Sequence, residues 1–195
     1  MTNFLKEIKF VAGIDYSLTS PAVCVAEIIN NEIKFENCKF HFLKQNKSHK
    51  SLGKIFAYDY PEYTDEIERF SKLASWTIEC IRWFDGRVNK VYLEDYAFAA
   101  TGKVFNIGEN TGILKKQLKE AGFKYTTIPP TVIKKHATGK GNANKELMYE
   151  AFTAELLTPS DLQTRLTPNS KKIRSPVSDI VDSYFIAKAG VEGLL

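Results

Sequence analysis

Four acidic residues are the side chains best suited to chemistry in this 195-residue chain. Asp15 interrupts the apolar run VAGIDYSLTSPAVCV, Glu94 ends the run VNKVYLE, and Asp179 and Asp182 lie three residues apart in VSDIVDSYF. A carboxylate beside a buried strand is costly unless another group compensates its charge. Each acid also has an ordinary explanation, because Asp15 can bond the amides of the turn that follows it and the Asp179–Asp182 pair can form a solvated stripe.

Taken together, the four acids favour a metal centre. Residues three apart share one face of a helix, where two like charges repel each other. No cluster of His or Cys accompanies the carboxylates, so the donor set is typical of a hard cation, Mg²⁺ or Mn²⁺, rather than of zinc. Two such ions, about 3.5–4 Å apart, can activate a water molecule and stabilise the leaving oxygen of an in-line displacement at phosphorus. The predicted chemistry is metal-dependent cleavage of a nucleic acid.

The positive charge of the chain is concentrated in its second half. The net charge is only +4, but segments 131–145 and 162–178 contain several Lys and Arg residues and no acid. Such segments are either solvated loops or phosphate-binding surfaces. Within the first, the glycine loop TGKGN at 138–142 precedes an expected helix and can direct backbone amides at a phosphate. It lacks the GK[ST] ending of a Walker loop.

The apolar patterns predict an α/β fold. Strands are expected at 10–15, 22–29, 33–42, 88–94 and 123–128, with a tight turn at 30–32. Helices are expected at about 65–84, 103–121, 131–137, 143–157 and 177–189, the last with Ser175 as its cap. The stretches 44–61 and 158–174 read as irregular. This order predicts one domain, 1–195, with a mixed five-stranded sheet, three antiparallel strands first, flanked by helices.

Other features narrow the class of protein. No apolar run approaches the roughly 20 residues needed to cross a bilayer, so no membrane partner is expected. The N-terminal sequence MTNFLKEIKF has no signal-like apolar core, which predicts a cytoplasmic location. Three cysteines without a CxxC pair argue against a disulfide framework.

Four segments of the chain resemble the RuvC-type Holliday junction resolvases of the ribonuclease H-like superfamily, in the order of that family. GIDYSLTSPAVCV is similar to the GIDPG motif with its turn and second strand. VYLEDYAFAATGKVFNIGENTG is similar to the segment in which a strand-end Glu precedes aromatic residues and a helix with two glycines, here Gly108 and Gly112. IPPTVIKKHATGKGNANKELM resembles the pattern P, VK, TGxGxAxK, and SDIVDSYFIA resembles the final D-x-x-D-A helix.

The resemblance implies a ribonuclease H-like fold and a homodimer that makes paired nicks across a four-way DNA junction, leaving 5′-phosphate and 3′-hydroxyl ends. It implies that the four acids are a catalytic tetrad that binds two Mg²⁺ or Mn²⁺ ions. An aromatic residue after the strand Glu would stack on the DNA; Phe98 is preferred to Tyr96, and core packing is the other explanation for it. The remaining DNA-binding residues are then expected to be Lys103, Lys134, Lys135, Lys140, Asn142, Lys145 and Arg174.

Three departures from the family pattern are visible. Ser17 stands about where the family has Gly, the 44–61 stretch is longer than in the cellular enzymes, and Tyr184 follows Ser183 where the family has Ala and Leu. These differences resemble phage-encoded members, which cleave a wider range of branched DNA. The predicted partners therefore include forks as well as four-way junctions, and the location would be the host cytoplasm.

Three other functions compete with this one. An ATP-handling relative of the actin or sugar-kinase type would need a duplicated fold and a second phosphate loop, for which the chain is too short. A non-catalytic DNA-junction-binding or scaffold protein of the same fold would be expected to lack one of the acids, and all four are present. Another ribonuclease H-like nuclease would share the carboxylates without needing the TGKGNANK segment.

Overall fold

The computed structural model describes residues 10–82, 88–95, 104–156 and 162–193. The strands in this part of the chain are β1 Phe10–Asp15, β2 Ala22–Glu27, β3 Cys38–Leu43, β4 Ile55–Tyr58, β5 Val88–Glu94 and β6 Lys124–Ile128. The α-helices are α1 Glu66–Arg82, α2 Val104–Glu120, α3 Pro130–Thr138, α4 Lys145–Ala154, α5 Leu162–Leu166 and α6 Val177–Glu192, and a 3-10 turn, η1, covers Phe35–Asn37.

One mixed sheet organises these elements. Its strand order is β4-β3-β2-β1-β5-β6. β1, β2 and β3 pair antiparallel, whereas β5 runs parallel to β1 and to β6, and β4 runs parallel to β3. The α/β class and the three antiparallel strands at the start are confirmed, and β5 lies beside β1 as crossover topology predicts.

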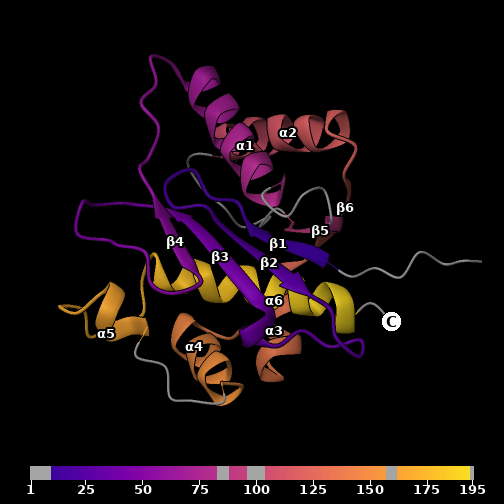
Figure 1. Cartoon of the computed structure of the whole chain (residues 1–195), viewed down its shortest axis with the longest axis vertical. Coiled ribbons are helices and arrows are strands. Elements are labelled where there is room, and N and C mark those ends of the chain that lie inside the picture. The colour runs from indigo at the N-terminus through magenta and orange to yellow at the C-terminus, as the bar shows by residue number, and fades with distance from the viewer. Residues whose placement is uncertain (1–9, 83–87, 96–103, 157–161, 194–195) are drawn as a thin grey trace, which may run out of the picture.

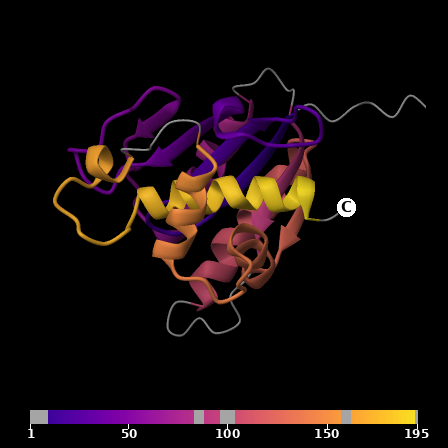
Figure 2. The same ribbon diagram turned by 90° about the horizontal axis from the view of Figure 1, so that it is seen from below.

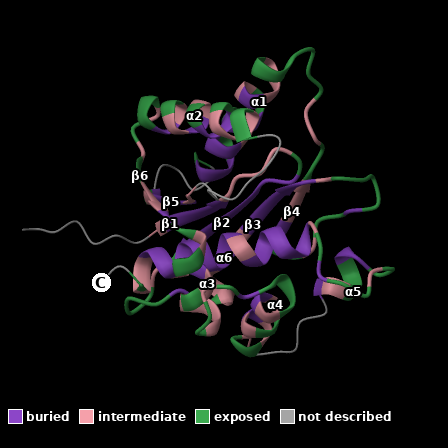
Figure 3. Ribbon diagram, turned by 180° about the vertical axis from the view of Figure 1, so that it is seen from behind, coloured by how far each residue is buried: buried purple, intermediate pink, exposed green. Residues whose placement is uncertain are grey.

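Helices cover both faces of the sheet (Figures 1 and 3). α1 and α2 lie on one face, and α6, with α3 and α4 beyond it, lies on the other. Each face has its own apolar cluster: Ala12 and Ile14 pack toward α1 and α2, whereas Val11 packs toward α6. Because both faces are covered, the central strands are almost entirely buried, which explains why β2 reads as the continuous apolar run AVCVA.

The sheet has six strands, so the prediction of five was wrong by one. The additional strand, β4, is a four-residue strand at the edge of the sheet, within the 44–61 stretch that was expected to be a loop. The expected strand at 33–42 begins only at Cys38. Phe35, in the 3-10 turn, instead stacks on Phe40 and makes an edge contact with Phe152 (ring centroids 5.5 Å apart in both pairs). Its apolar character therefore reflects packing and not strand alternation.

The tight turn predicted at 30–32 is confirmed. Asn30 and Asn31 both have positive φ (55° and 63°), as a tight hairpin turn requires, and Ile29 bridges to Glu32 across it. Asp65 accepts a hydrogen bond from the Glu68 amide and so caps α1 (2.8 Å).

Helix boundaries differ from the predicted ones by a few residues, and the short helix α5 lies within the 158–174 stretch that was expected to be irregular.

Candidate active site

The ends of β1 and β5 bring two of the four acids together. Asp15 is the last residue of β1 and Glu94 the last residue of β5. The two strands are parallel neighbours in a register that pairs Ile14 with Leu93, so the acids follow at adjacent positions at the carboxyl edge of the sheet. Side chains alternate along a strand, and Ile14 and Leu93 pack toward α1. Asp15 and Glu94 are therefore on the α6 face.

Helix α6 crosses this face at a very short distance from the backbone of β1. A Cβ atom placed on Gly13 would lie 2.3 Å from the carbonyl oxygen of Ser183 and 2.4 Å from the amide nitrogen of Ala187. Farther along the helix, a Cβ on Gly190 would lie 2.3 Å from the Tyr92 ring. Only glycine permits both approaches. The two contacts seat α6, the yellow helix of Figure 2, across β1 and β5. The first turns of the helix carry Asp179 and Asp182, whose charges act on Asp15 at the end of β1.

The resulting cluster is electrostatically strained. Burial raises the pKa of Asp15 well above its ordinary value, and the charges of Asp179, Asp182 and Glu94 raise it further. Burial, Glu94 and Asp179 together raise the pKa of Asp182 to about 7. Burial also raises the pKa of Glu94. These mutual effects show that all four acids, from three separate elements, lie within electrostatic reach of one another.

Asp179 is fixed by three hydroxyl groups. Only 6% of its surface is exposed. Ser20 Oγ donates to Oδ2 (2.5 Å), while the Oγ atoms of Ser175 and Ser178 each donate to Oδ1 (3.0 Å). The solvated stripe is therefore excluded as an explanation for Asp179. Ser175 does not cap α6 as predicted, because its hydroxyl bonds Asp179 instead.

These serines were missed as site residues at the sequence level. The only available signal was their position, since Ser20 lies in the turn after β1, and Ser175 and Ser178 flank the start of the acidic helix. Serines at such positions ordinarily indicate turns and caps. Their common partner is fixed by the tertiary structure, which brings Ser20 across 159 residues of sequence to Asp179.

The turn after β1 is also held from α1. Arg69 donates from Nη2 to the carbonyl oxygen of Leu18 (2.7 Å), and the hydroxyl of Tyr60 donates to the same oxygen (2.5 Å). Arg69 Nε donates in turn to the Tyr60 hydroxyl (2.9 Å). These bonds fix the loop that connects Asp15 to Ser20, which is a positioning role that the sequence alone did not reveal.

Two of the predicted DNA-binding lysines lie at the acid cluster. The positive charge of Lys145 lowers the pKa values of Asp15 and Asp182, and that of Lys134 lowers those of Glu94 and Asp182. These effects offset only part of the rise that burial causes. Lys145 Nζ also donates to Ser178 Oγ (3.1 Å). Two cations thus face four carboxylates, and the remaining negative charge is not balanced within the cluster.

The other predicted DNA-binding residues have different surroundings. Lys135, Lys140, Asn142 and Arg174 are exposed. Phe98, Tyr96 and Lys103 lie outside the described residues. Among the described residues, the exposed aromatic side chain nearest to them in sequence is Phe105, at the start of α2, with 85% of its surface exposed.

The glycine loop connects two helices. Gly139, with φ of 76°, ends α3 in the left-handed conformation, and its amide bonds the carbonyl of Lys135. The helix that follows begins two residues later than expected, at Lys145. Asn144 caps it by accepting a hydrogen bond from the Leu147 amide (2.9 Å). Since a side chain of the protein already accepts from this amide, the loop has a structural explanation beside the predicted phosphate-binding one.

The donor set of the cluster fits a hard divalent cation. The neighbouring acids raise the pKa values of Asp15 and Asp182, so a cation that neutralised the cluster would relieve this repulsion, and oxygen ligands suit Mg²⁺ or Mn²⁺. Among residues 10–82, 88–95, 104–156 and 162–193, no three acidic, His or Cys side chains are already arranged as a metal cage. The fit therefore rests on the chemistry and the unbalanced charge of the donors.

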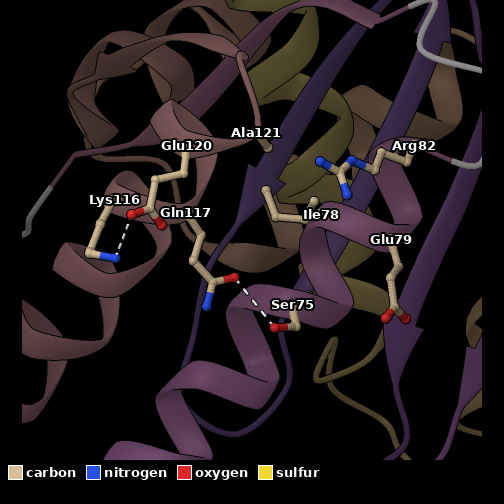
Figure 4. A pocket seen from close by; sticks show the side chains of 8 residues that line it. All are labelled: Ser75, Ile78, Glu79, Arg82, Lys116, Gln117, Glu120 and Ala121. Atoms are coloured by element: carbon tan, nitrogen blue, oxygen red, sulfur yellow. Dashed lines mark hydrogen bonds and ion pairs between the residues drawn. The ribbon is translucent and has the colours of Figure 1, made fainter.

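A cavity of about 450 Å³ between α1 and α2 is not part of this site (Figure 4). It lies on the opposite face of the sheet, where Lys116 pairs with Glu120 (2.6 Å) and the hydroxyl of Ser75 donates to Gln117 (3.4 Å). Because these polar groups are on the surface and largely satisfied by one another, the cavity lacks the buried, uncompensated charge of the carboxylate cluster.

No family model and no curated protein matches the chain in sequence. Its fold, however, is that of the ribonuclease H-like Holliday junction resolvases. RuvC of Thermus thermophilus aligns with a TM-score of 0.60 and 18% identity, over 94% of this chain and 96% of that one. The same protein in complex with a Holliday junction substrate gives 0.58 and 17%, over 95% and 94% of the two chains.

A viral protein shows the same similarity. The fowlpox virus resolvase, solved with Holliday junction DNA, aligns with a TM-score of 0.56 and 15% identity, over 95% of this chain and 99% of that one. At such identities the likeness establishes a shared fold. The ribonuclease H-like architecture predicted from the sequence is thereby confirmed.

Proposed function

We propose that this protein is a divalent-metal-dependent endonuclease that cleaves Holliday junctions and other branched DNA by paired nicks. The observation that carries the proposal is the meeting of Asp15, Glu94, Asp179 and Asp182 at one edge of the sheet, where burial and the charges of the neighbouring acids raise the pKa values of Asp15 and Asp182. Support comes from the fold, which is shared over nearly the whole chain with resolvases solved on junction DNA.

The four carboxylates would hold two Mg²⁺ or Mn²⁺ ions. Bound there, the ions would supply an activated water and charge stabilisation for displacement at a phosphodiester. The three serines would keep the Asp179 carboxylate in one orientation, so that it need not reorganise when the substrate binds. Lys145 and Lys134 would contact the phosphate that is cut, because both lie at the cluster and carry the charge that a phosphate requires.

The exposed cations would bind the DNA backbone on either side of the cut. Lys135, Lys140 and Asn142 lie on or after α3, which packs against α6, and Arg174 precedes α6. Contacts of this kind position a duplex without reading its sequence. Paired nicks require two active sites, so the functional unit would be a homodimer. Phe98 and Lys103 remain proposed DNA contacts.

The function can be tested by cleavage of end-labelled four-way junctions, Y-forks and linear duplexes in Mg²⁺, Mn²⁺ or EDTA. We expect metal-dependent nicks in the junction, placed symmetrically on opposite strands, and slower cutting of the fork. The Asp182→Asn protein should bind the junction without cutting it. The ends should carry a 5′-phosphate and a 3′-hydroxyl.

Other outcomes identify the competing functions. Junction binding by the wild-type protein with no cleavage in either metal would indicate a non-catalytic junction-binding protein. Efficient cutting of linear duplex or of RNA–DNA hybrids would indicate a different ribonuclease H-like nuclease. If the protein neither bound nor cleaved any of these DNAs, that result would contradict a role on DNA.

A further inference from the structure

Asp179 differs from the other three acids of the cluster because hydrogen bonds already surround its carboxylate. Ser20 Oγ donates to Oδ2 (2.5 Å), and the Oγ atoms of Ser175 and Ser178 both donate to Oδ1 (3.0 Å). The carboxylates of the other three acids accept no hydrogen bond from the described residues. Asp179 would therefore meet an incoming cation with part of its donor capacity already in use.

The capacity that is left on Asp179 follows from the lone pairs of its carboxylate. An ionised carboxylate has two oxygens with about four acceptor positions in all. Ser175 and Ser178 fill both positions on Oδ1, and Ser20 fills one of the two on Oδ2. Within the described residues, one position, on Oδ2, is left for a metal ion. An ion that bound both oxygens would first have to displace a serine from Oδ1.

The serines are held in their places, so such a displacement is costly. Ser178 is buried, and its oxygen accepts a hydrogen bond from Lys145 Nζ (3.1 Å). Ser20 is also buried, and its Oγ lies 3.0 Å from the Oγ of Ser175. Hydrogen bonds to a charged group are stronger than those between neutral groups. The loss of one on ion binding is expected to weaken the affinity by at least about tenfold.

Divalent cations differ in how far this restriction affects them. Mg²⁺ takes an octahedral shell of ligands at about 2.0–2.1 Å and keeps several waters, and Mn²⁺ also favours octahedral oxygen sites. Ca²⁺ is larger, takes about 6–8 oxygens and binds carboxylates through one or both oxygens. A carboxylate that is limited to one oxygen therefore satisfies an octahedral ion and withholds a ligand from the larger one.

We propose that Ser175 and Ser178 are specificity-determining residues of the metal site, because they restrict Asp179 to a single-oxygen ligand and so favour Mg²⁺ and Mn²⁺ over Ca²⁺. The inference rests on the proposed function, since it requires that the carboxylate cluster holds divalent ions. It assigns part of the choice of ion to two side chains that do not themselves bind the metal.

The first test is calorimetric titration of the metal-free protein with Mg²⁺, Mn²⁺ and Ca²⁺, in the absence of DNA. The Ser175→Ala/Ser178→Ala protein frees Oδ1, so its ratio of Ca²⁺ affinity to Mg²⁺ affinity should exceed that of the wild type by about tenfold. The ratio of Mn²⁺ to Mg²⁺ affinity should not change. Ratios are compared because a general loosening of the site, or a shift of Lys145, would alter the affinities for all three ions together.

Three variants serve as matched controls. Ser20→Ala removes one hydrogen bond from the same carboxylate but leaves Oδ1 filled, so the calcium-to-magnesium ratio should stay at its wild-type value. Ser183→Ala makes the same change at another buried serine of α6, whose hydroxyl donates to the Ile180 carbonyl (2.8 Å), and should also preserve the ratio. Ser175→Thr keeps a hydroxyl at its position and should retain the wild-type selectivity.

The circular dichroism of each variant shows whether it folds. If the double variant does not fold, Ser175→Ala alone, at a half-buried position, should raise the ratio in the same direction. An equal rise in Ser20→Ala would mean that the filled Oδ1 atom is not the cause.

The second test shows the ligands directly. In crystals soaked with Ca²⁺, the wild-type protein should place one oxygen of Asp179 at about 2.3–2.6 Å from the ion, and the double variant should place both oxygens there.

The outcomes separate this inference from the proposed function. An unchanged calcium-to-magnesium ratio in the double variant, or calcium bound by both oxygens of Asp179 in the wild type, would overturn the inference and leave the endonuclease proposal standing. If the ratio rises as expected and the wild type cuts no DNA, the proposed function fails and the selectivity remains. If no ion binds to the wild type, both are overturned.

Discussion

The two faces of the sheet are packed against helices in opposite ways. On the α1–α2 face, apolar side chains such as Leu73, Ile81 and Leu114 fill the interior, and charged groups such as the Lys116–Glu120 pair stay at the surface. On the α6 face, the first turns of the helix bring carboxylates into the interior beside Asp15. The same sheet therefore has one face that is packed for stability and one that also buries charge.

The difference shows how the fold accommodates a charged site. Ordinary packing with large side chains separates a helix from a sheet by about 10 Å. At Gly13 the backbone of α6 touches the backbone of β1, and this close approach brings acids from a helix and from strand ends to one place. The glycines of α2, Gly108 and Gly112, serve no such approach, because a Cβ atom placed on either would have no atom of the described residues within 4 Å.

The largest expected effect is on catalysis, and it should be confined to the α6 face. Asp15→Asn and Asp182→Asn should each abolish junction cleavage, because a neutral amide is a poor ligand for a hard divalent cation. Cleavage rates and junction affinity are measured for each protein. Glu79→Gln removes the same charge from the exposed surface of α1 and should cut at the wild-type rate. Wild-type cleavage by either Asn protein would refute the assignment of the tetrad.

The second effect is on stability and tests the close approach itself. Gly13→Ala places a methyl group within 2.3–2.8 Å of α6 and should lower the free energy of unfolding by about 3 kcal/mol. Gly108→Ala, in the open surface of α2, should be neutral or stabilise by up to about 1 kcal/mol, because alanine favours a helix. Urea titrations followed by circular dichroism provide both values. Equal effects of the two substitutions would mean that the two faces do not differ in this way.

The third effect is on the pH dependence of stability without metal. The pKa of Asp182 is raised to about 7, so the folded protein holds more protons than the unfolded chain between about pH 4 and pH 7. Stability from this group is present at low pH and is lost as the pH rises through 7. In EDTA at pH 8, the Asp182→Asn protein should therefore unfold at a higher temperature than the wild type, and its free energy of unfolding should be higher by about 2–4 kcal/mol. This difference in free energy should shrink at pH 5.

Thermal unfolding at the two pH values measures this difference, with Glu79→Gln as the control that should show no such change. Addition of Mg²⁺ or Mn²⁺ at pH 8 should raise the unfolding temperature of the wild type more than that of Asp182→Asn, because a cation relieves the same repulsion. A pH-independent difference between the two proteins would contradict the strained cluster.

The smallest effect is on DNA affinity. Lys140→Ala removes an exposed cation after α3 and should reduce junction affinity several-fold, with a decrease of about 1 in the slope of log K against log salt. Lys116→Ala, on α2, removes a charge that is already paired with Glu120 and should leave the slope unchanged. Binding is measured by fluorescence anisotropy at several salt concentrations. An unchanged slope for Lys140→Ala would mean that this loop does not touch phosphate.

The parts of the fold that the sequence predicted are those with strong local signals. The apolar runs of β1, β2 and β5, the amphipathic pattern of α1 and the asparagine turn at 30–31 all have a mechanism that acts within a few residues. β4 was missed because four residues at a sheet edge show no clear period. The segment at 33–37 was mistaken for a strand because Ile33 and Phe35 are apolar for reasons of packing against distant residues.

The sequence by itself determined the chemical inventory of the protein: four acids at strand ends and on one helix, two basic segments, and the order of strands and helices. Only the tertiary structure decided which groups meet. Ser20 reaches Asp179, and Lys134 and Lys145 reach the acids, all between elements far apart in the chain. The physical reason is that burial, close approach and shared charge depend on distances in space, which local sequence patterns do not specify.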